Sequence, residues 1–308
     1  MNFKIKIVIF FLLTLFFNNK IYALENKILF KVDNEIITSI DILNEIQYLS
    51  LLNKNLSNLK KENIFEIAKN SIIKEKIKII ELSRYLDKIE VEQKYYKLFL
   101  NDYIKNLNVS SLEDFERLIL EKGIKIENIQ QKIKVELLWN QLIFSKFSKD
   151  IKINKEKIKE EILKNNLQNE YLISEIVFNL DKGQQLNTKL NLIKSEIKDN
   201  SFSSAALMHS ISNSSNNGGR LGWIKLNSLN SKIKNQILKT KVNGITEPIV
   251  IPGGFIILKI NDVRKTKIVD NIDKEVELVV REVSNKQLNQ HSIIYFNKIK
   301  KEIEINEF

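Results

Sequence analysis

Apolar residues recur at helical spacing along two stretches of the chain. Between residues 39 and 165 they return every three or four positions, as at Phe65, Ala68 and Ile72, and the same spacing runs from 270 to 301. This period places apolar side chains on one face of a helix, where they can build a core. We therefore predict amphipathic helices over both stretches.

The segment between these two stretches has a mixed pattern. Strand-like apolar runs lie at 171–180 and 249–263, and helical patterns lie at 186–198, 202–209 and 233–238. Strands that enclose several helices within about 95 residues are typical of a small α+β domain. We expect one such domain here.

Short strand-like runs also lie near both ends of the chain. Residues 27–38 carry two apolar runs around the turn pair Asp33 and Asn34, which predicts a hairpin. The chain closes on the apolar alternation at 303–305. Because this tail is too small to form its own domain, we expect it to pack back on the N-terminal helices.

The predicted fold class is therefore α+β, with a discontinuous helical module that contains an inserted domain. All ten glycine and proline residues except Gly123 lie between 183 and 254, where the insert needs its turns. The four predicted parts are a signal peptide (1–23), an N-terminal helical module (24–168), the inserted domain (169–264) and a C-terminal helix and strand (265–308).

The first residues have the features of an export signal. Lys4 and Lys6 precede an apolar run at 7–17, and a helix of about eleven residues spans about 16 Å, roughly half of a bilayer core. That length favours a signal peptide, with cleavage expected after Ala23 and no stable membrane anchor afterwards. The alternative is an uncleaved anchor that extends the apolar run.

Charge and composition limit the possible partners and cofactors. The net charge of +11 raises the question of nucleic acid, but five of the 49 basic residues are Arg, and lysines alternate with glutamates, as at 152–161. This mixture is typical of solvated helices, so we expect no nucleic-acid partner. With no cysteine and two histidines, we expect no metal and no cofactor. His209 is interpreted as a packing and hydrogen-bonding residue and His291 as solvated.

Three ordered motifs in the middle segment resemble those of parvulin-type prolyl isomerases. They are NGGRLGW at 217–223, VNGITEP at 242–248 and GFIILKI at 254–260. The flanking segments, KVDNEIITSIDI, IKINKEKIKEEI and the closing IEI, are similar to those of SurA-type periplasmic chaperones. Together the resemblance covers nearly all of the chain beyond the signal, and it implies one parvulin domain.

The resemblance also indicates where an isomerase site would lie. Such enzymes rotate X–Pro bonds, whose barrier is about 18–20 kcal/mol, by holding proline in an apolar pocket and stabilising a twisted amide. The family's two strand histidines and its Cys or Asp correspond here to Glu175, Ile256 and Ser212. Isoleucine cannot hydrogen-bond, and an ionised glutamate would place negative charge beside the carbonyl. We therefore assign no catalytic residue and expect weak or lost isomerase activity.

The residues expected to form the proline or peptide pocket remain apolar: Leu221, Leu229, Ile233 and Phe255. By resemblance, the chain is expected to be a periplasmic chaperone that binds unfolded polypeptides, in particular outer-membrane proteins. Two alternatives stay open. One is an active peptidyl-prolyl cis-trans isomerase that assists the folding of exported proteins and uses Glu175 and Ser212. The other is a scaffold whose parvulin domain binds one specific partner.

Overall fold

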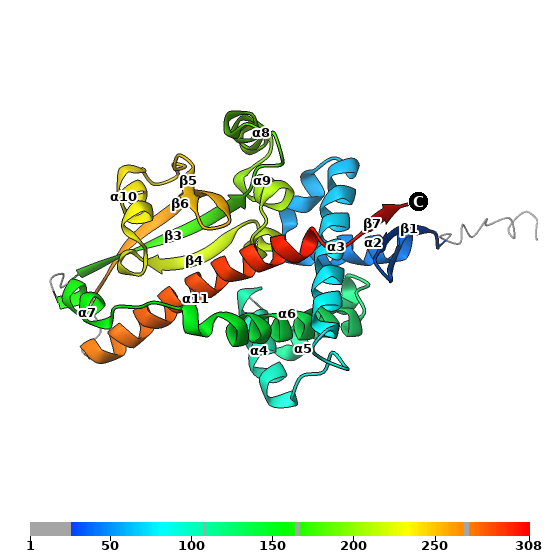
Figure 1. The fold of residues 1–308 in the computed structure, drawn as a ribbon, viewed down its shortest axis with the longest axis horizontal. Coiled ribbons are helices and arrows are strands. Elements are labelled where there is room, and N and C mark those ends of the chain that lie inside the picture. The colour runs from blue at the N-terminus through cyan, green and yellow to red at the C-terminus, as the bar shows by residue number, and fades with distance from the viewer. Residues whose placement is uncertain (1–25, 108, 164–166, 268–270) are drawn as a thin grey trace, which may run out of the picture.

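The computed structural model describes residues 26–107, 109–163, 167–267 and 271–308. The predicted signal peptide and its cleavage after Ala23 lie outside these residues. Helices and two small sheets give the chain an α+β fold (Figure 1). None of the helices in the described ranges is both long and apolar enough to cross a membrane.

The two ends of the described chain meet in one small sheet. The hairpin of β1 (Ile28–Val32) and β2 (Glu35–Thr38) turns at Asp33, which adopts a positive φ of 47°. β7 (Ile305–Glu307) pairs antiparallel with β1, so the strand order is β2-β1-β7. The Asp33 N–H also donates to the Glu304 carbonyl at 2.9 Å. The C-terminal tail therefore lies on the N-terminal hairpin.

The N-terminal region is a group of helices packed around a common core. Trp139 is fully buried in this core, and its indole N–H donates to the Ser292 hydroxyl at 2.8 Å. Thr38 caps the first helix through a capping box with Asp41, which satisfies free N–H groups at the helix start. The elements are α2 (Ser39–Leu52), η1 (Lys54–Asn58), α3 (Lys61–Ser83), α4 (Gln93–Asn106), α5 (Leu112–Glu121), α6 (Ile126–Phe147), η2 (Ser148–Asp150) and α7 (Lys155–Leu163).

The middle segment forms a four-stranded antiparallel sheet of order β4-β3-β6-β5. Helices α8 and α9 pack on one face of this sheet, and α10 packs on the other. β4 falls in the glycine-containing motif, where the apolar pattern predicts no strand. The elements are β3 (Leu167–Phe178), α8 (Leu186–Asp199), α9 (Phe202–His209), η3 (Asn213–Asn217), β4 (Arg220–Lys225), η4 (Leu226–Ser228), α10 (Ser231–Lys239), β5 (Ile249–Ile251) and β6 (Gly254–Lys267).

Gly219 allows β4 to approach β3. Its φ is +76°, and a Cβ at this position would lie 2.1 Å from the Glu175 carbonyl oxygen. The Glu175 N–H donates to the Gly219 carbonyl at 2.8 Å. Only glycine combines this backbone conformation with so close an approach. The glycine motif thereby fixes the position of Glu175 in the sheet.

One long helix joins the sheet to the N-terminal helices. α11 (Ile272–Lys300) is preceded by its N-cap residue Asn271, whose side chain accepts from the Lys274 N–H at 3.1 Å. It contacts α3, α6 and α7 along one side and η4 beside the four-stranded sheet. In Figure 1 this orange-to-red helix runs between the sheet and α6. Groups from distant parts of the sequence therefore meet along α11.

Candidate functional site

A cavity of about 340 Å³ lies against one face of the four-stranded sheet, and we call it the sheet cavity. Glu175 of β3, Ser212 from the turn before η3 and Ile256 of β6 come together in its lining, as do three of the four residues proposed for the pocket. Those three come from β4, from the turn after η4 and from α10: Leu221, Leu229 and Ile233.

The structure does not bring Phe255 into the sheet cavity. Side chains alternate between the two faces of a strand, so Phe255 lies opposite Ile256. Its ring stacks on Phe178, with the ring centroids 5.6 Å apart, in the cluster formed with α8 and α9. On the cavity side, β6 contributes Ile256 and Leu258. The pocket prediction for Phe255 therefore fails because of strand alternation.

Glu175 is the polar centre of the sheet cavity. It is 8% exposed, and its Oε1 accepts hydrogen bonds from the hydroxyls of Ser212 at 2.6 Å and Ser214 at 2.9 Å. Burial raises the pKa of the Glu175 carboxyl, and the two serine hydroxyls oppose that effect. Reasoning from the sequence did not identify Ser214. Its position two residues after Ser212, in a serine-rich turn, could have indicated that it contacts the same carboxylate.

The long helix α11 closes the sheet cavity on the side away from the strands. The Lys286 ammonium donates to the Ser228 hydroxyl at 2.7 Å and to the Ser228 carbonyl at 3.4 Å. Burial lowers the pKa of Lys286 to about 8, although Glu282 and Glu175 act in the other direction. Reasoning from the sequence missed the contribution of α11 to the cavity lining, because the family motifs end before this helix. The lining residues of this helix are Glu282, Asn285, Lys286, Asn289, Gln290 and Ile293.

A second cavity, of about 410 Å³, lies between the N-terminal helices, η3 and α11. Its lining carries an unusual number of amide side chains, so we call it the amide cavity. Asn289 of α11 lines both cavities. Lys74, Glu75, Lys132 and Glu136 add charged groups. The amides belong to Asn140, Asn213, Asn216, Asn217 and Asn289.

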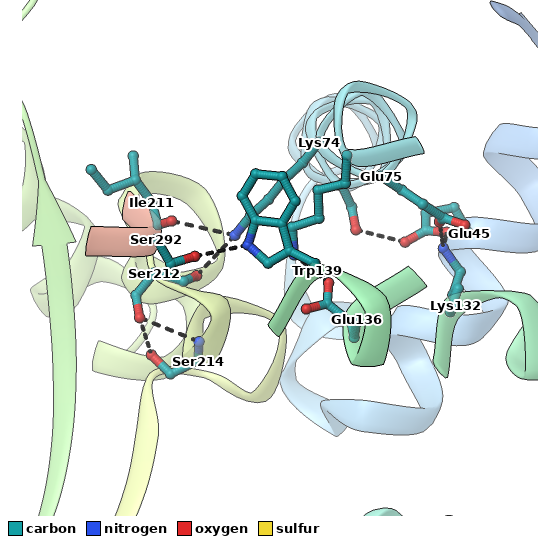
Figure 2. Close-up of polar contacts among 12 residues, drawn as sticks. Glu45, Lys74, Glu75, Lys132, Glu136, Trp139, Ile211, Ser212, Ser214 and Ser292 are labelled. Atoms are coloured by element: carbon teal, nitrogen blue, oxygen red, sulfur yellow. Dashed lines mark hydrogen bonds and ion pairs between the residues drawn. The ribbon is translucent and has the colours of Figure 1, made fainter. Parts of the chain in front are cut away.

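Most charges around the amide cavity are paired. The Lys132 ammonium lies 2.6 Å from Glu45 and also pairs with Glu75. Burial by itself would lower the pKa of Lys132, but the two carboxylates outweigh it and raise the value. Lys78 pairs with Glu136. Lys132 therefore lies between two carboxylates and Lys78 lies against one, and Figure 2 shows Lys132 beside Glu45 and Glu75.

Lys74 differs from its neighbours. Among the described residues, its ammonium donates only to the backbone carbonyls of Ile211, at 3.3 Å, and Ser212, at 3.4 Å (Figure 2). The residues that the structure describes provide no ion pair for it. Burial lowers the pKa of Lys74 to about 7; repulsion from Lys78 adds to the effect, and attraction to Glu136 opposes it. Ser212 therefore accepts from Lys74 with its carbonyl while its hydroxyl donates to Glu175, and so joins the two cavities.

Comparison with known proteins identifies the sheet and its helices. Residues 173–262 match the family model of the PPIC-type PPIASE domain. This range of the chain includes Glu175, Ser212 and Ile256. The chain carries a parvulin-type domain. The strand side of the sheet cavity belongs to this domain, at the place where the resemblance puts the isomerase site, and α11 lies outside the matched residues.

The chain is also similar to SurA chaperones beyond the parvulin-type domain. Chaperone SurA of Pseudomonas putida is 24% identical over 172 residues, which are 52% of this chain and 40% of that protein. Chaperone SurA of Idiomarina loihiensis is 23% identical over 271 residues, which are 82% of this chain and 61% of that protein. The chain thus spans about two fifths to three fifths of the length of these relatives.

A solved structure of one of two SurA-like chaperones of Campylobacter jejuni also matches. It is 16% identical and covers 92% of this chain and 99% of that chain, with a TM-score of 0.35.

Proposed function

We propose that this protein is a periplasmic chaperone that binds unfolded polypeptides, outer-membrane proteins among them, and that its parvulin-type domain has weak or no isomerase activity. The similarity to SurA chaperones supports the chaperone role. The observation that carries the second part is the composition of the sheet cavity, where Glu175, Ser212 and Ile256 gather beside aliphatic side chains.

The sheet cavity suits binding better than catalysis. Rotation of an X–Pro bond is accelerated by groups that stabilise the twisted amide more than the planar one. Ile256 offers no hydrogen bond, and the Ser212 hydroxyl already donates its hydrogen bond to the Glu175 carboxylate. The aliphatic lining can still hold a proline ring or another apolar side chain, because burial of apolar surface needs no polar group.

We also propose the domain division 24–168, 169–264 and 265–308, with export directed by residues 1–23. The pairing of β7 with β1 and the contact of α11 with α6 support the assignment of the last part to the N-terminal module. In this arrangement the parvulin-type domain is an insertion, and α11 is the element through which the module contacts it.

The isomerase part is tested with a protease-coupled assay on proline peptides. We expect the full chain to be at least about a hundredfold slower than an active parvulin, because a lost transition-state contact of about 2.7 kcal/mol has that effect. Turnover comparable with an active parvulin would contradict the proposal.

One observation favours the alternative of an active isomerase. Because burial raises the pKa of Glu175, a protonated carboxyl could donate a hydrogen bond to the substrate. The same assay at pH 5 and pH 8, with Glu175→Gln as the comparison, separates the two proposals. Turnover that rises toward pH 5 in the wild type, but no longer depends on pH in Glu175→Gln because the amide donates at both pH values, would establish the isomerase.

A further inference from the structure

The two cavities share a boundary. Asn289 lines both, and Ser212, in the lining of the sheet cavity, directly precedes Asn213, which lines the amide cavity. The Lys74 ammonium lies 3.4 Å from the Ser212 carbonyl. One residue of an extended chain advances about 3.3 Å. A bound segment would therefore need only a few residues to reach from one cavity to the other.

The chemistry of the two cavities is different and complementary. The sheet cavity is lined mainly by aliphatic side chains, including Leu221, Leu229 and Ile233. The amide cavity carries five asparagine side chains, each with a donor and an acceptor group. Such amides can pair with the N–H and C=O groups of any extended backbone. The combination suits an extended polypeptide with an apolar side chain at one place.

Lys74 adds a charge preference to this site. It lines the amide cavity, and among the described residues its ammonium has only the two long hydrogen bonds to carbonyls. Glu75 and Glu136 line the same cavity, but they are paired with Lys132 and Lys78. An incoming carboxylate would give Lys74 a charge-assisted hydrogen bond, which is roughly twice as strong as a neutral one.

We propose that the two cavities form one composite site for an extended polypeptide segment, in which a proline or aliphatic side chain enters the sheet cavity and an acidic side chain within about three residues of it pairs with Lys74. This inference rests on the proposed chaperone function and specifies the class of segment that is bound. Asn289 lies between the two subsites and contacts the backbone of the segment.

The test uses three fluorescein-labelled peptides of nine residues. All share a central Pro-Leu pair, and they carry Glu, Gln or Lys at the second position on each side of the pair, so that either chain direction is covered. Binding to the full chain is measured by anisotropy at pH 6.5, below the pKa of Lys74. We expect the Glu peptide to bind at least about tenfold more tightly than the Gln peptide, and the Lys peptide to bind weakest.

Two variants remove the charge while the site stays otherwise intact. In Lys74→Met and Lys74→Gln we expect the Glu and Gln peptides to bind within about twofold of each other, with the Gln peptide close to its wild-type affinity. Lys61→Met is the matched control, because Lys61 is an exposed residue of the same helix. The Lys61→Met variant should keep the full preference for the Glu peptide over the Gln peptide. Leu229→Asp should weaken all three peptides, because it places a charge in the sheet cavity.

The composite site is wrong if wild type binds the Glu and Gln peptides equally, if the preference survives both Lys74 variants, or if none of the peptides binds. Failure of the proposed function is recognised separately, by the ability of the chain to keep an unfolded protein from aggregating. If that ability is present and the charge preference is absent, only the composite site fails. If the chain neither prevents aggregation nor shows the charge preference, the proposed function fails together with the composite site.

Discussion

Lys74 is a half-buried lysine that forms no ion pair with the described residues. Its ammonium has two backbone carbonyls as acceptors and lies 5.9 Å from the centre of the Phe296 ring. Removing an ammonium from water is costly unless a carboxylate compensates. A helical module selected for stability alone would be better served by an apolar side chain here. A lysine at this position therefore suits the proposed role in binding better than a role in stability.

Lys74→Met should stabilise the protein, and by an amount that depends on pH. The folded-state pKa of Lys74 is about 7, against 10.5 for the ordinary group. Between these values the unfolded chain binds more protons, so wild-type stability rises with pH, whereas below pH 7 the full cost remains. We expect a gain of about 1–3 kcal/mol at pH 6 that shrinks toward pH 10. Urea unfolding at both pH values measures it.

Lys61→Met serves as the control and should change stability little at either pH, because Lys61 is exposed. The interpretation of Lys74 would be contradicted if Lys74→Met were less stable than wild type at pH 6. A gain of the same size at pH 6 and pH 10 would also contradict it.

Individual site residues were predictable only where a local motif marks them. The family motifs identified the positions of Glu175, Ser212 and Ile256, and the structure brings the three residues into one cavity lining. The motifs carried no information on which strand face Phe255 would take. His291 is not simply solvated, because it stacks on Phe147 with ring centroids 4.9 Å apart. That contact joins α11 to the end of α6, two segments that no sequence motif connects.

His209 shows the same limit. It is largely buried, as expected for a packing residue, but no described residue hydrogen-bonds to its Nε2. Burial lowers the pKa of His209 to about 4. The sequence can indicate that the His209 side chain packs, whereas its hydrogen-bond partners depend on the complete fold.

At the scale of elements, α11 has two packing faces. Ser292 receives the hydrogen bond of Trp139 in the N-terminal core, while Lys286 and Ile293 face the sheet cavity. The helical spacing predicts the helix over 270–301, close to the observed Ile272–Lys300. It does not predict the second contact, because a helix with apolar residues on more than one side can pack in several orientations.

Ile293→Asp should loosen α11 from the parvulin-type domain. Ile293 packs against the apolar cluster of the sheet, and a carboxylate there would lose apolar burial and face the aliphatic side chains of that cluster. We expect a loss of about 2 kcal/mol or more, with faster hydrogen exchange in β5 and β6 and stronger binding of an apolar dye. Hydrogen-exchange mass spectrometry locates the change.

Arg281→Asp is the control for this experiment. Arg281 is an exposed residue of the same helix, so introducing a carboxylate there should change exchange in β5 and β6 much less. Equal effects of the two substitutions would show that α11 does not close the sheet cavity through Ile293.

At the scale of the whole molecule, the composition of the chain marks its organisation, but the composite site depends on tertiary packing. The glycine and proline cluster indicates the insert, and the short closing segment predicts a tail that packs back on the N-terminal helices. Its pairing with β1 of the hairpin is visible only in the structure. The amide cavity instead brings α3 to the turn before η3, segments separated by 137 residues between Lys74 and Ile211. No local pattern marks such a pair.

The same arrangement explains how one molecule could bind many clients. Backbone-directed amides and an aliphatic cavity place few demands on sequence, and a single acidic contact gives a preference without strict specificity. α11 lines both cavities, so the relative position of the helical module and the parvulin-type domain determines the shape of the site.

The most direct test is suppression of aggregation of an unfolded outer-membrane barrel protein, diluted from urea and followed by light scattering without ATP. We predict that the full chain prevents the rise in scattering at about equimolar ratio. We further predict that Leu229→Asp weakens this effect, while Leu238→Asp, at a position 54% exposed on the same helical region, does not. Unchanged aggregation in the presence of excess wild-type protein would contradict the chaperone assignment.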